Sequence, residues 1–459
     1  MRVIKKLSIT FLFVIVGICS VMFSKVSSVK SAGGIKIDKA HFSDSMIYYC
    51  ENDFDTNHDS YLSQSEISKA KIIYDLMYDT KRYVYRDFRG IEYLTSLEKI
   101  ELEHIRIVNF NVYNLPKLKS IKCTNCKFKK TGIKFDKLKS IEELIFFDTD
   151  IKYKGDFRYN KKLKSLSVYR ANVNKVAIKK LKNLKSFEYF GDMKKINLSK
   201  NVKLEHLDIN MSRADKIDIS HNKKLKELRV GGSIKSFDLK NNKLLKRVDI
   251  SSDVCTSIDI SGFNKLKYLK LDMPLADIRV TNNISLRSLR IKANLKSIDL
   301  TGNEKITYCE IDAPLETFDA SVFGNLGNLV LSNLRMDELK LINGTVKHLE
   351  LNGCDISTVD VSLLDKIKDV CITKGNVKKL IISENNLNIS GIHAFKCNGF
   401  TEIEIGSCSR LQLISYGCSD IEGEDTRIPV EEWLDVSRKT IIVLPDVISL
   451  WVTQMYDVD

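Results

Sequence analysis

Apolar residues recur with a period of about 20 residues along most of the chain. The first unit of this pattern begins at Leu97 and the last at Ile367, and positions 1, 4 and 6 are apolar in every unit. The unit that begins at Leu225, for example, continues with Leu228 and Val230. So regular a period predicts a repeat array in which each unit buries its apolar residues against its neighbours. The fourteen starts are Leu97, Leu118, Ile141, Leu163, Leu184, Leu204, Leu225, Leu245, Leu266, Leu286, Ile306, Leu326, Val346 and Ile367.

Each unit also holds a second segment about ten residues later. Apolar residues there alternate around one polar position, as in Phe237, Asp238 and Leu239. A period of two predicts a strand. An Asn often follows, and we expect these residues to stack at a turn and satisfy backbone groups of the adjacent unit. The Asn positions are Asn201, Asn222, Asn242, Asn283, Asn303 and Asn385, and the series is interrupted at Phe263, Phe323, Gly344 and Leu364.

These units resemble the bacterial leucine-rich-repeat family. The segment IKSFDLKNNKL, residues 234–244, matches the family consensus LxxLxLxxNxL. The resemblance implies a leucine-rich-repeat solenoid of about 14 or more coils of 20–23 residues, which usually serves as a recognition surface. It covers residues 90–428, so we expect one elongated domain here rather than several globules.

Residues 1–32 have the pattern of a signal peptide. Basic residues near Met1 precede an apolar run from Leu7 to Phe23, and small residues follow. A retained membrane anchor is the alternative, because the run is close to the lower limit of about 17 residues for a bilayer span. Ile18 precedes Cys19 where a lipoprotein signal has a small residue, and no sortase signal follows Leu444. We therefore expect a protein that is secreted or exposed on the cell surface.

Residues 33–89 predict a small helical cap with an EF-hand-like calcium loop. The segment DTNHDSYLSQSE places oxygen donors at the spacing that wraps one Ca²⁺. Helical patterns flank it, an entering one through Met46 and an exiting one from Ile67 to Leu76. Ser60 replaces the usual Gly, at a cost of about 1 kcal/mol. The predicted ligands are Asp55, Asn57, Asp59, Tyr61, Ser63 and Glu66.

Two interpretations of this loop stay open. It binds one calcium ion, the only cofactor that the sequence suggests, or it is a scaffold that caps the solenoid. Its place before the segment GIEYL, which starts at Gly90, resembles secreted bacterial proteins in which a DxNxDGxLSxxE loop precedes leucine-rich repeats. Single loops of this type also resemble part of a dockerin, although a dockerin usually pairs two.

The chain ends in a segment of different composition, residues 429–459. It contains both tryptophans, Trp433 and Trp451, and is acidic, so we expect a C-terminal cap over the last coil. Cys397 and Cys418 lie one coil apart and are either free thiols or a disulfide. The isolated CxxC of Cys123 and Cys126 predicts packing or solvent positions in the array rather than redox or metal chemistry.

Charge adds a second pattern to the array. The net charge is +14, and it falls to +9 without the five basic residues of segment 1–32. Lysines concentrate at coil boundaries and predict a basic strip, which either solubilises the protein or holds it against anionic wall polymers or phospholipid headgroups. Aspartates occupy the outward position of many second segments. We name these residues the Asp column: Asp218, Asp238, Asp259, Asp299, Asp319 and Asp360. The column is a solvated face, a row of bound cations or a partner-binding stripe.

The motifs argue against catalysis. The chain has no GxSxG, no HExxH and no phosphate-binding glycine loop, and its seven histidines are scattered. Nucleic-acid binding is also not expected, since no basic cluster is interleaved with aromatics. The first functional hypothesis is an exported, non-catalytic and monomeric recognition protein that binds a protein or a surface glycan through a repeat face. The alternative is a structural or adhesive envelope component held by charge to anionic wall polymers.

Overall fold

The computed structural model describes most of the chain between residues 34 and 453. The described residues are 34–76, 84–129, 133–151, 157–171, 176–191, 196–213, 217–341, 346–383, 385–386, 388–395, 402–405, 413–417, 440–443 and 451–453. The predicted signal peptide, Gly344, Cys397, Cys418 and Trp433 lie outside them. Among the helices that are described, none is long and apolar enough to cross a membrane.

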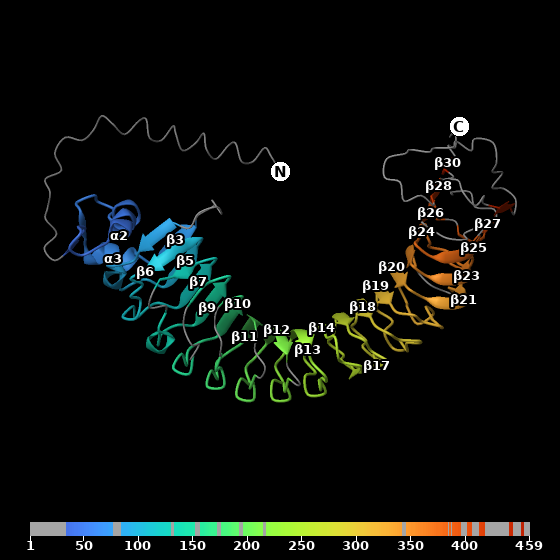
Figure 1. The fold of residues 1–459 in the computed structure, drawn as a ribbon, viewed down its shortest axis with the longest axis horizontal. Coiled ribbons are helices and arrows are strands. Elements are labelled where there is room, and N and C mark those ends of the chain that lie inside the picture. The colour runs from blue at the N-terminus through green and yellow to red at the C-terminus, as the bar shows by residue number, and fades with distance from the viewer. Residues whose placement is uncertain are drawn as a thin grey trace.

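The repeat array folds into an arc whose inner side is one parallel β-sheet (Figure 1). Each of the fourteen units contributes one strand, and further strands precede and follow them, so the predicted leucine-rich-repeat solenoid is confirmed. We call this layer the concave sheet. Its strands pair in chain order: β3 (Ile72–Leu76), β5 (Lys99–Glu103), β7 (Ser120–Thr124), β9 (Glu143–Phe147), β10 (Ser165–Tyr169), β11 (Ser186–Gly191), β12 (His206–Arg213), β13 (Glu227–Ser233), β14 (Arg247–Ser251), β16 (Tyr268–Asp272), β18 (Ser288–Lys292), β19 (Tyr308–Asp312), β20 (Asn328–Ser332), β22 (His348–Asn352), β24 (Asp369–Thr373), β26 (Gly391–Phe395) and β28 (Leu413–Gly417).

The period of two within each strand decides which side chains enter the core. In the unit that begins at Leu245, the residues at positions 1, 4 and 6, including Val248 and Ile250, are fully buried. Arg247 and Asp249 alternate with them and point to the concave surface. Parallel pairing in register stacks equivalent residues of successive units, so the apolar positions form one continuous core.

The second segments lie on the outer side of the arc, and only some of them form strands. The outer segments that do form strands are β4 (Val84–Asp87), β6 (Ile105–Val108), β8 (Lys127–Phe128), β15 (Ser257–Asp259), β17 (Asp277–Arg279), β21 (Arg335–Lys340), β23 (Asp355–Asp360), β25 (Asn376–Ile382) and β27 (Glu402–Ile405). The strand prediction was wrong for units such as those at 237–239 and 298–300. Where outer strands do form, they pair in parallel with their neighbours, as β15 does with β17 and β21 with β23.

Buried asparagines line the turns between the outer segments and the concave sheet. The Asn222 amide donates to the carbonyl oxygens of Leu198 and Asn201 in the preceding unit, at 3.2 and 2.9 Å. The predicted ladder is therefore present, with one correction of register. Asn386 is the buried member and donates to the preceding unit, whereas Asn385 is exposed.

The N-terminal cap holds two short helices. α2 (Asp44–Tyr49) continues into the π-helical turn η1 (Cys50–Phe54), and α3 (Gln64–Lys69) begins within the last three residues of the calcium-loop segment. β1 (Ile35–Lys36), which precedes both helices, pairs antiparallel with β2 (Tyr61–Leu62), which lies between them in the chain. The predicted exiting helix ends at Lys69, and the rest of its pattern forms β3. Ile72, Ile73 and Tyr74 favour a strand, and pairing with β5 buries Ile73.

The cap packs directly on the start of the solenoid. The Tyr49 hydroxyl donates to the carboxylate of Asp75 in β3, and Arg86 Nε lies 2.6 Å from the same carboxylate. The 3₁₀ turn η2 (Ile91–Tyr93) begins after Gly90, whose φ of 101° is left-handed. A Cβ on Gly90 would lie 2.3 Å from a ring carbon of Phe42, so glycine is required at this junction.

At the other end, two antiparallel strands follow the parallel ones. β29 (Thr440–Val443) pairs with β27, and β30 (Trp451–Thr453) pairs with β28. They fall within the segment 429–459 for which we predict a cap.

Candidate functional site

The predicted calcium loop forms a turn with a dense set of hydrogen bonds. Asp55 accepts from the backbone N–H groups of Asp59 and Ser60, at 3.3 and 3.0 Å. Asn57 accepts from Asp59, and Asp59 accepts from Tyr61. Ser60 has a φ of 62°, so the chain makes the left-handed turn although the usual Gly is missing.

Glu66, the last predicted ligand, is turned toward its own loop. One oxygen accepts from the N–H of Thr56 at 2.9 Å, and the other accepts from the N–H and hydroxyl of Ser63. Burial favours the neutral acid, but these hydrogen bonds outweigh it and lower the pKa of Glu66 to about 2. In the described part of the chain, no three Asp, Glu, His or Cys side chains converge on a common metal position. The donors suit Ca²⁺ in kind, but Glu66 would have to exchange these bonds for the ion.

The Asp column lies on the outer side of the arc and supports local turns. In each of its members, one carboxylate oxygen accepts the backbone N–H two residues further on. For Asp259 and Ser261 this distance is 2.9 Å, and for Asp319 and Ser321 it is 2.8 Å. The same bond forms at Asp218, Asp238, Asp299 and Asp360. The column is exposed except at Asp360, which is buried and lies 3.6 Å from Lys340 Nζ.

Three aromatic side chains stack on the concave sheet, where the sequence analysis expected no site. The rings of Phe147 and Tyr169 are parallel, with centroids 4.4 Å apart, and Phe190 adds a tilted ring 4.6 Å beyond Tyr169. We call these residues the aromatic stack. Phe147 is 41% exposed, and Ile145 on the same strand face is half-buried beside it.

A charged network borders the aromatic stack. His206 bridges two carboxylates, with Nε2 3.4 Å from Glu188 and Nδ1 3.1 Å from Glu227. The hydrogen bond to Glu188 raises the pKa of His206 and lowers that of Glu188. Burial raises the pKa of the next carboxyl, Asp208, although Arg229 lies 3.5 Å away. The concave surface thus combines an apolar centre with fixed charges.

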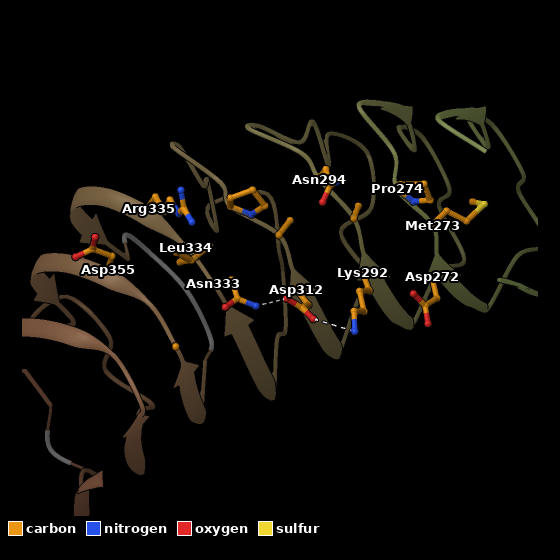
Figure 2. Close-up of a pocket in the computed structure, with 14 residues that line it drawn as sticks. Asp272, Met273, Pro274, Lys292, Asn294, Asp312, Asn333, Leu334, Arg335 and Asp355 are labelled. Carbon is orange, nitrogen blue, oxygen red and sulfur yellow. Dashed lines mark hydrogen bonds and ion pairs between the residues drawn. The ribbon is translucent and has the colours of Figure 1, made fainter. Parts of the chain in front are cut away.

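A groove of about 650 Å³ runs along the rim of the solenoid, across the strand ends from β16 to β22 (Figure 2). Its floor contains the buried residues Met273, Ala293, Ala313 and Leu334. The ends of the concave strands supply one wall, with Asp272, Lys292, Asp312 and Asn333. The other wall contains Pro274 and Asn294 from the following loops and Arg335, the first residue of β21. We call this feature the rim groove.

Lysines cluster along a coil boundary, as expected for the basic strip. A hollow of about 240 Å³ is lined by Lys162, Lys164, Lys185 and Lys203 together with Asn183 and Glu142. Glu142 pairs with Lys164 at 2.6 Å, so four cations share one anion in this lining. We call this feature the lysine hollow.

The described cysteines are all free. Cys123 and Cys126 are buried, and burial raises the pKa of Cys123 well above that of an ordinary thiol. The Cys126 thiol faces the carbonyl oxygens of Leu102 and Thr124 at 3.4 and 3.3 Å. This pair therefore packs in the core, as predicted.

The aromatic stack had a detectable sequence signal. Phe147, Tyr169 and Phe190 each occupy position 7 of three consecutive units, that is, the residue after the last buried position. Residues in the same position of parallel neighbours lie side by side, so the period alone places the three rings together. The rim groove has no such signal, because it depends on the path of the loops after each strand.

No protein-family model matches the chain, and no curated protein matches it. Solved structures with the same fold do exist. The functional domain of InlJ from Listeria monocytogenes is 18% identical, with a TM-score of 0.66 over 94% of this chain and 100% of that one. The leucine-rich-repeat protein LIC12759 of Leptospira interrogans is 16% identical, with a TM-score of 0.53 over 68% and 93% of the two chains. The InlJ domain includes a cysteine ladder, whereas the buried ladder here consists of asparagines.

Proposed function

We propose that this chain is an exported, non-catalytic recognition protein that binds a protein partner through its concave sheet. The observation that carries the proposal is the aromatic stack. Large aromatic side chains, fixed by their neighbours and partly exposed, are the residues that contribute most at protein interfaces. The core beneath Phe147 and Tyr169 holds them in place, so little conformational entropy is lost when a partner covers them.

The arrangement favours a protein over a glycan. Sugars pack on the flat faces of aromatic rings, and one face of Phe147 and one face of Tyr169 are covered by their mutual contact at 4.4 Å. Ile145 lies on the same face of β9 as Phe147, and Glu188 lies on the same face of β11 as Phe190. Such a mixed apolar and charged surface is complementary to protein side chains.

Capture from cell-surface material tests the class of partner. The immobilised protein is incubated with host and bacterial surface extracts after protease treatment or after periodate oxidation of glycans. We expect protease to abolish capture and periodate to leave it unchanged. Loss with periodate and persistence after protease would instead establish a glycan ligand.

The lysine hollow supports the second hypothesis, an envelope component retained by charge. Lys162, Lys164, Lys185 and Lys203 present a positive surface that can attract the phosphates of anionic wall polymers. In this case the protein is released from cells by about 1 M salt, which shortens the Debye length to about 3 Å. Retention at that salt concentration would contradict attachment by charge.

We also propose that the N-terminal loop binds one Ca²⁺. Support comes from the left-handed Ser60 and from Asp55, which is buried and oriented by two backbone N–H groups. Asp55, Asn57, Asp59, Tyr61, Ser63 and Glu66 would supply the oxygens. The Asp column has a local role in its turns, and its use as a partner-binding stripe stays a prediction.

A further inference from the structure

The rim groove contains polar groups that the fold leaves unused. Within the described residues, the carboxylate of Asp272 and the guanidinium of Arg335 have no ion-pair partner, and the Asn294 side chain makes no hydrogen bond. Asp312 is partly satisfied, because Asn333 donates to it at 2.5 Å and Lys292 lies 3.8 Å from it. Figure 2 shows Lys292 turned toward Asp312 and not toward Asp272.

The spacing of the acidic groups restricts the shape of a ligand. Asp272 and Asp312 occupy the same position of units two coils apart, in β16 and β19, which separates them by about 9.6 Å. A polyproline-II helix rises about 9.3 Å per turn of three residues and returns each third side chain to the same face. A β-strand does not fit, because its residues three apart point to opposite faces.

We propose that the rim groove binds a polyproline-II peptide segment of a partner protein that carries a basic residue at every third position. One basic residue pairs with Asp272 and the next with Asp312. The small floor residues Ala293 and Ala313 leave room for the backbone, and the Asn294 amide donates to a carbonyl oxygen, which a polyproline-II helix leaves free.

Lys292 gives the proposal an unusual consequence. It lies in the unit between the two aspartates and competes for Asp312, since its Nζ is 3.8 Å from that carboxylate. It also repels a basic ligand. Removal of this lysine is therefore expected to strengthen binding, whereas removal of Asp272 weakens it.

The test uses the peptide (Lys-Pro-Pro)₃-NH₂, labelled with a fluorophore at its N-terminus, and fluorescence anisotropy with the full chain. We expect saturable binding, weaker binding of a peptide with three consecutive lysines and the same composition, and no binding of the Glu-Pro-Pro analogue. Asp272→Asn should weaken the affinity about two- to fivefold and Lys292→Gln should strengthen it by a similar factor, the usual range for an exposed ion pair. Asp277→Asn, an exposed aspartate outside the groove, is the matched control and should bind like the unmodified protein.

Circular dichroism checks that each variant keeps its fold. Equal affinity for the two lysine peptides would reduce the interaction to nonspecific charge and overturn the proposal. Absence of binding, or tighter binding by Asp272→Asn than by Lys292→Gln, would overturn it as well.

Discussion

The ring of Phe147 lies parallel to the ring of Tyr169, with 5° between their planes and 4.4 Å between their centroids. The two residues come from neighbouring units and meet because β9 and β10 pair in register. The regular pairing of the strands thus fixes the positions of the variable side chains on the concave surface. The scaffold can keep its buried positions while the outward residues of each strand determine what the concave sheet binds.

The stacking energy of this pair is measurable by a double-mutant cycle. Phe147→Ala, Tyr169→Ala and the double variant are unfolded by urea, and we expect a coupling of about 0.5–1.5 kcal/mol. Tyr159 is also exposed but lies outside the stack, so Tyr159→Ala combined with Phe147→Ala should show additive effects. Additivity of the stacked pair would mean that the two rings do not stabilise each other.

The asparagine ladder predicts very different outcomes for two adjacent residues. Asn386→Ala removes an amide that donates to the carbonyl oxygens of Val361 and Leu364, so two buried acceptors lose their partner. We expect a loss of about 1–3 kcal/mol in the free energy of unfolding. Asn385→Ala, at the exposed neighbour, should change it by less than about 0.5 kcal/mol. Equal effects at both positions would contradict the assigned register.

For the Asp column, the turn hydrogen bond predicts that the acceptor oxygen matters. Asp259→Ala should lower the free energy of unfolding by about 0.5–1.5 kcal/mol, while Asp259→Asn, which keeps the oxygen, should cost less. Hydrogen bonds from Ser261 lower the pKa of Asp259. The carboxylate therefore stabilises the fold above its unfolded pKa of about 3.9, and this contribution is lost as the pH falls through the lowered value. Denaturation at pH 2–7 should show this acid loss in the unmodified protein and not in Asp259→Asn.

The His206 bridge predicts a pH dependence of the opposite sign. Its pKa is raised by the hydrogen bond to Glu188, so protonation stabilises the folded state. The contribution is complete below the unfolded pKa of about 6.5 and disappears as the pH rises through the raised value. His206→Gln should therefore lose stability at pH 5.5 and little at pH 9. An equal loss at both pH values would exclude the charged bridge.

Calcium binding predicts local protection of the N-terminal loop. Hydrogen exchange of residues 55–66 should slow in 5 mM Ca²⁺ relative to chelator, because an ion that binds only the folded loop stabilises it by about 2.7 kcal/mol at 100 times its Kd. Asp55→Asn should abolish the difference, whereas Asp277→Asn should not. Identical exchange with calcium and with chelator would leave the loop as a scaffold only.

The sequence predicts those features of the molecule that repeat. A buried position such as Leu228 recurs with the period, so the repeat array, the first strand of each unit and most of the ladder follow from spacing, and the family resemblance adds the solenoid. The spacing did not show which of the two strand columns faces the concave side. The prediction of an exiting helix up to Leu76 was wrong. Ile67, Ala70, Ile73 and Leu76 fit a helical period, but pairing with β5 makes Ile72–Leu76 a strand. Pairing between strands that are distant in the sequence cannot be predicted from the local pattern of apolar residues.

Sites on the surface were harder to predict. The spacing of Asp259 and its equivalents suggested a binding stripe, but it could not show that each carboxylate accepts a backbone N–H of its own turn. Conversely, the three rings at position 7 were visible in the sequence, although their exposure depends on the side of the sheet that faces outward. The rim groove could be found only from the path of the loops that follow the strands.

The central claim is that the aromatic stack on the concave sheet recognises a protein partner. Capture of surface proteins by the unmodified protein, by Phe147→Ser/Phe190→Ser and by the outer-side control Asp277→Asn tests it most directly, with circular dichroism to verify each fold. We expect the control to retain the captured protein and the double variant to lose at least about tenfold in affinity, since interface hot spots contribute about 2 kcal/mol or more. Undiminished capture by a folded Phe147→Ser/Phe190→Ser variant would contradict the account.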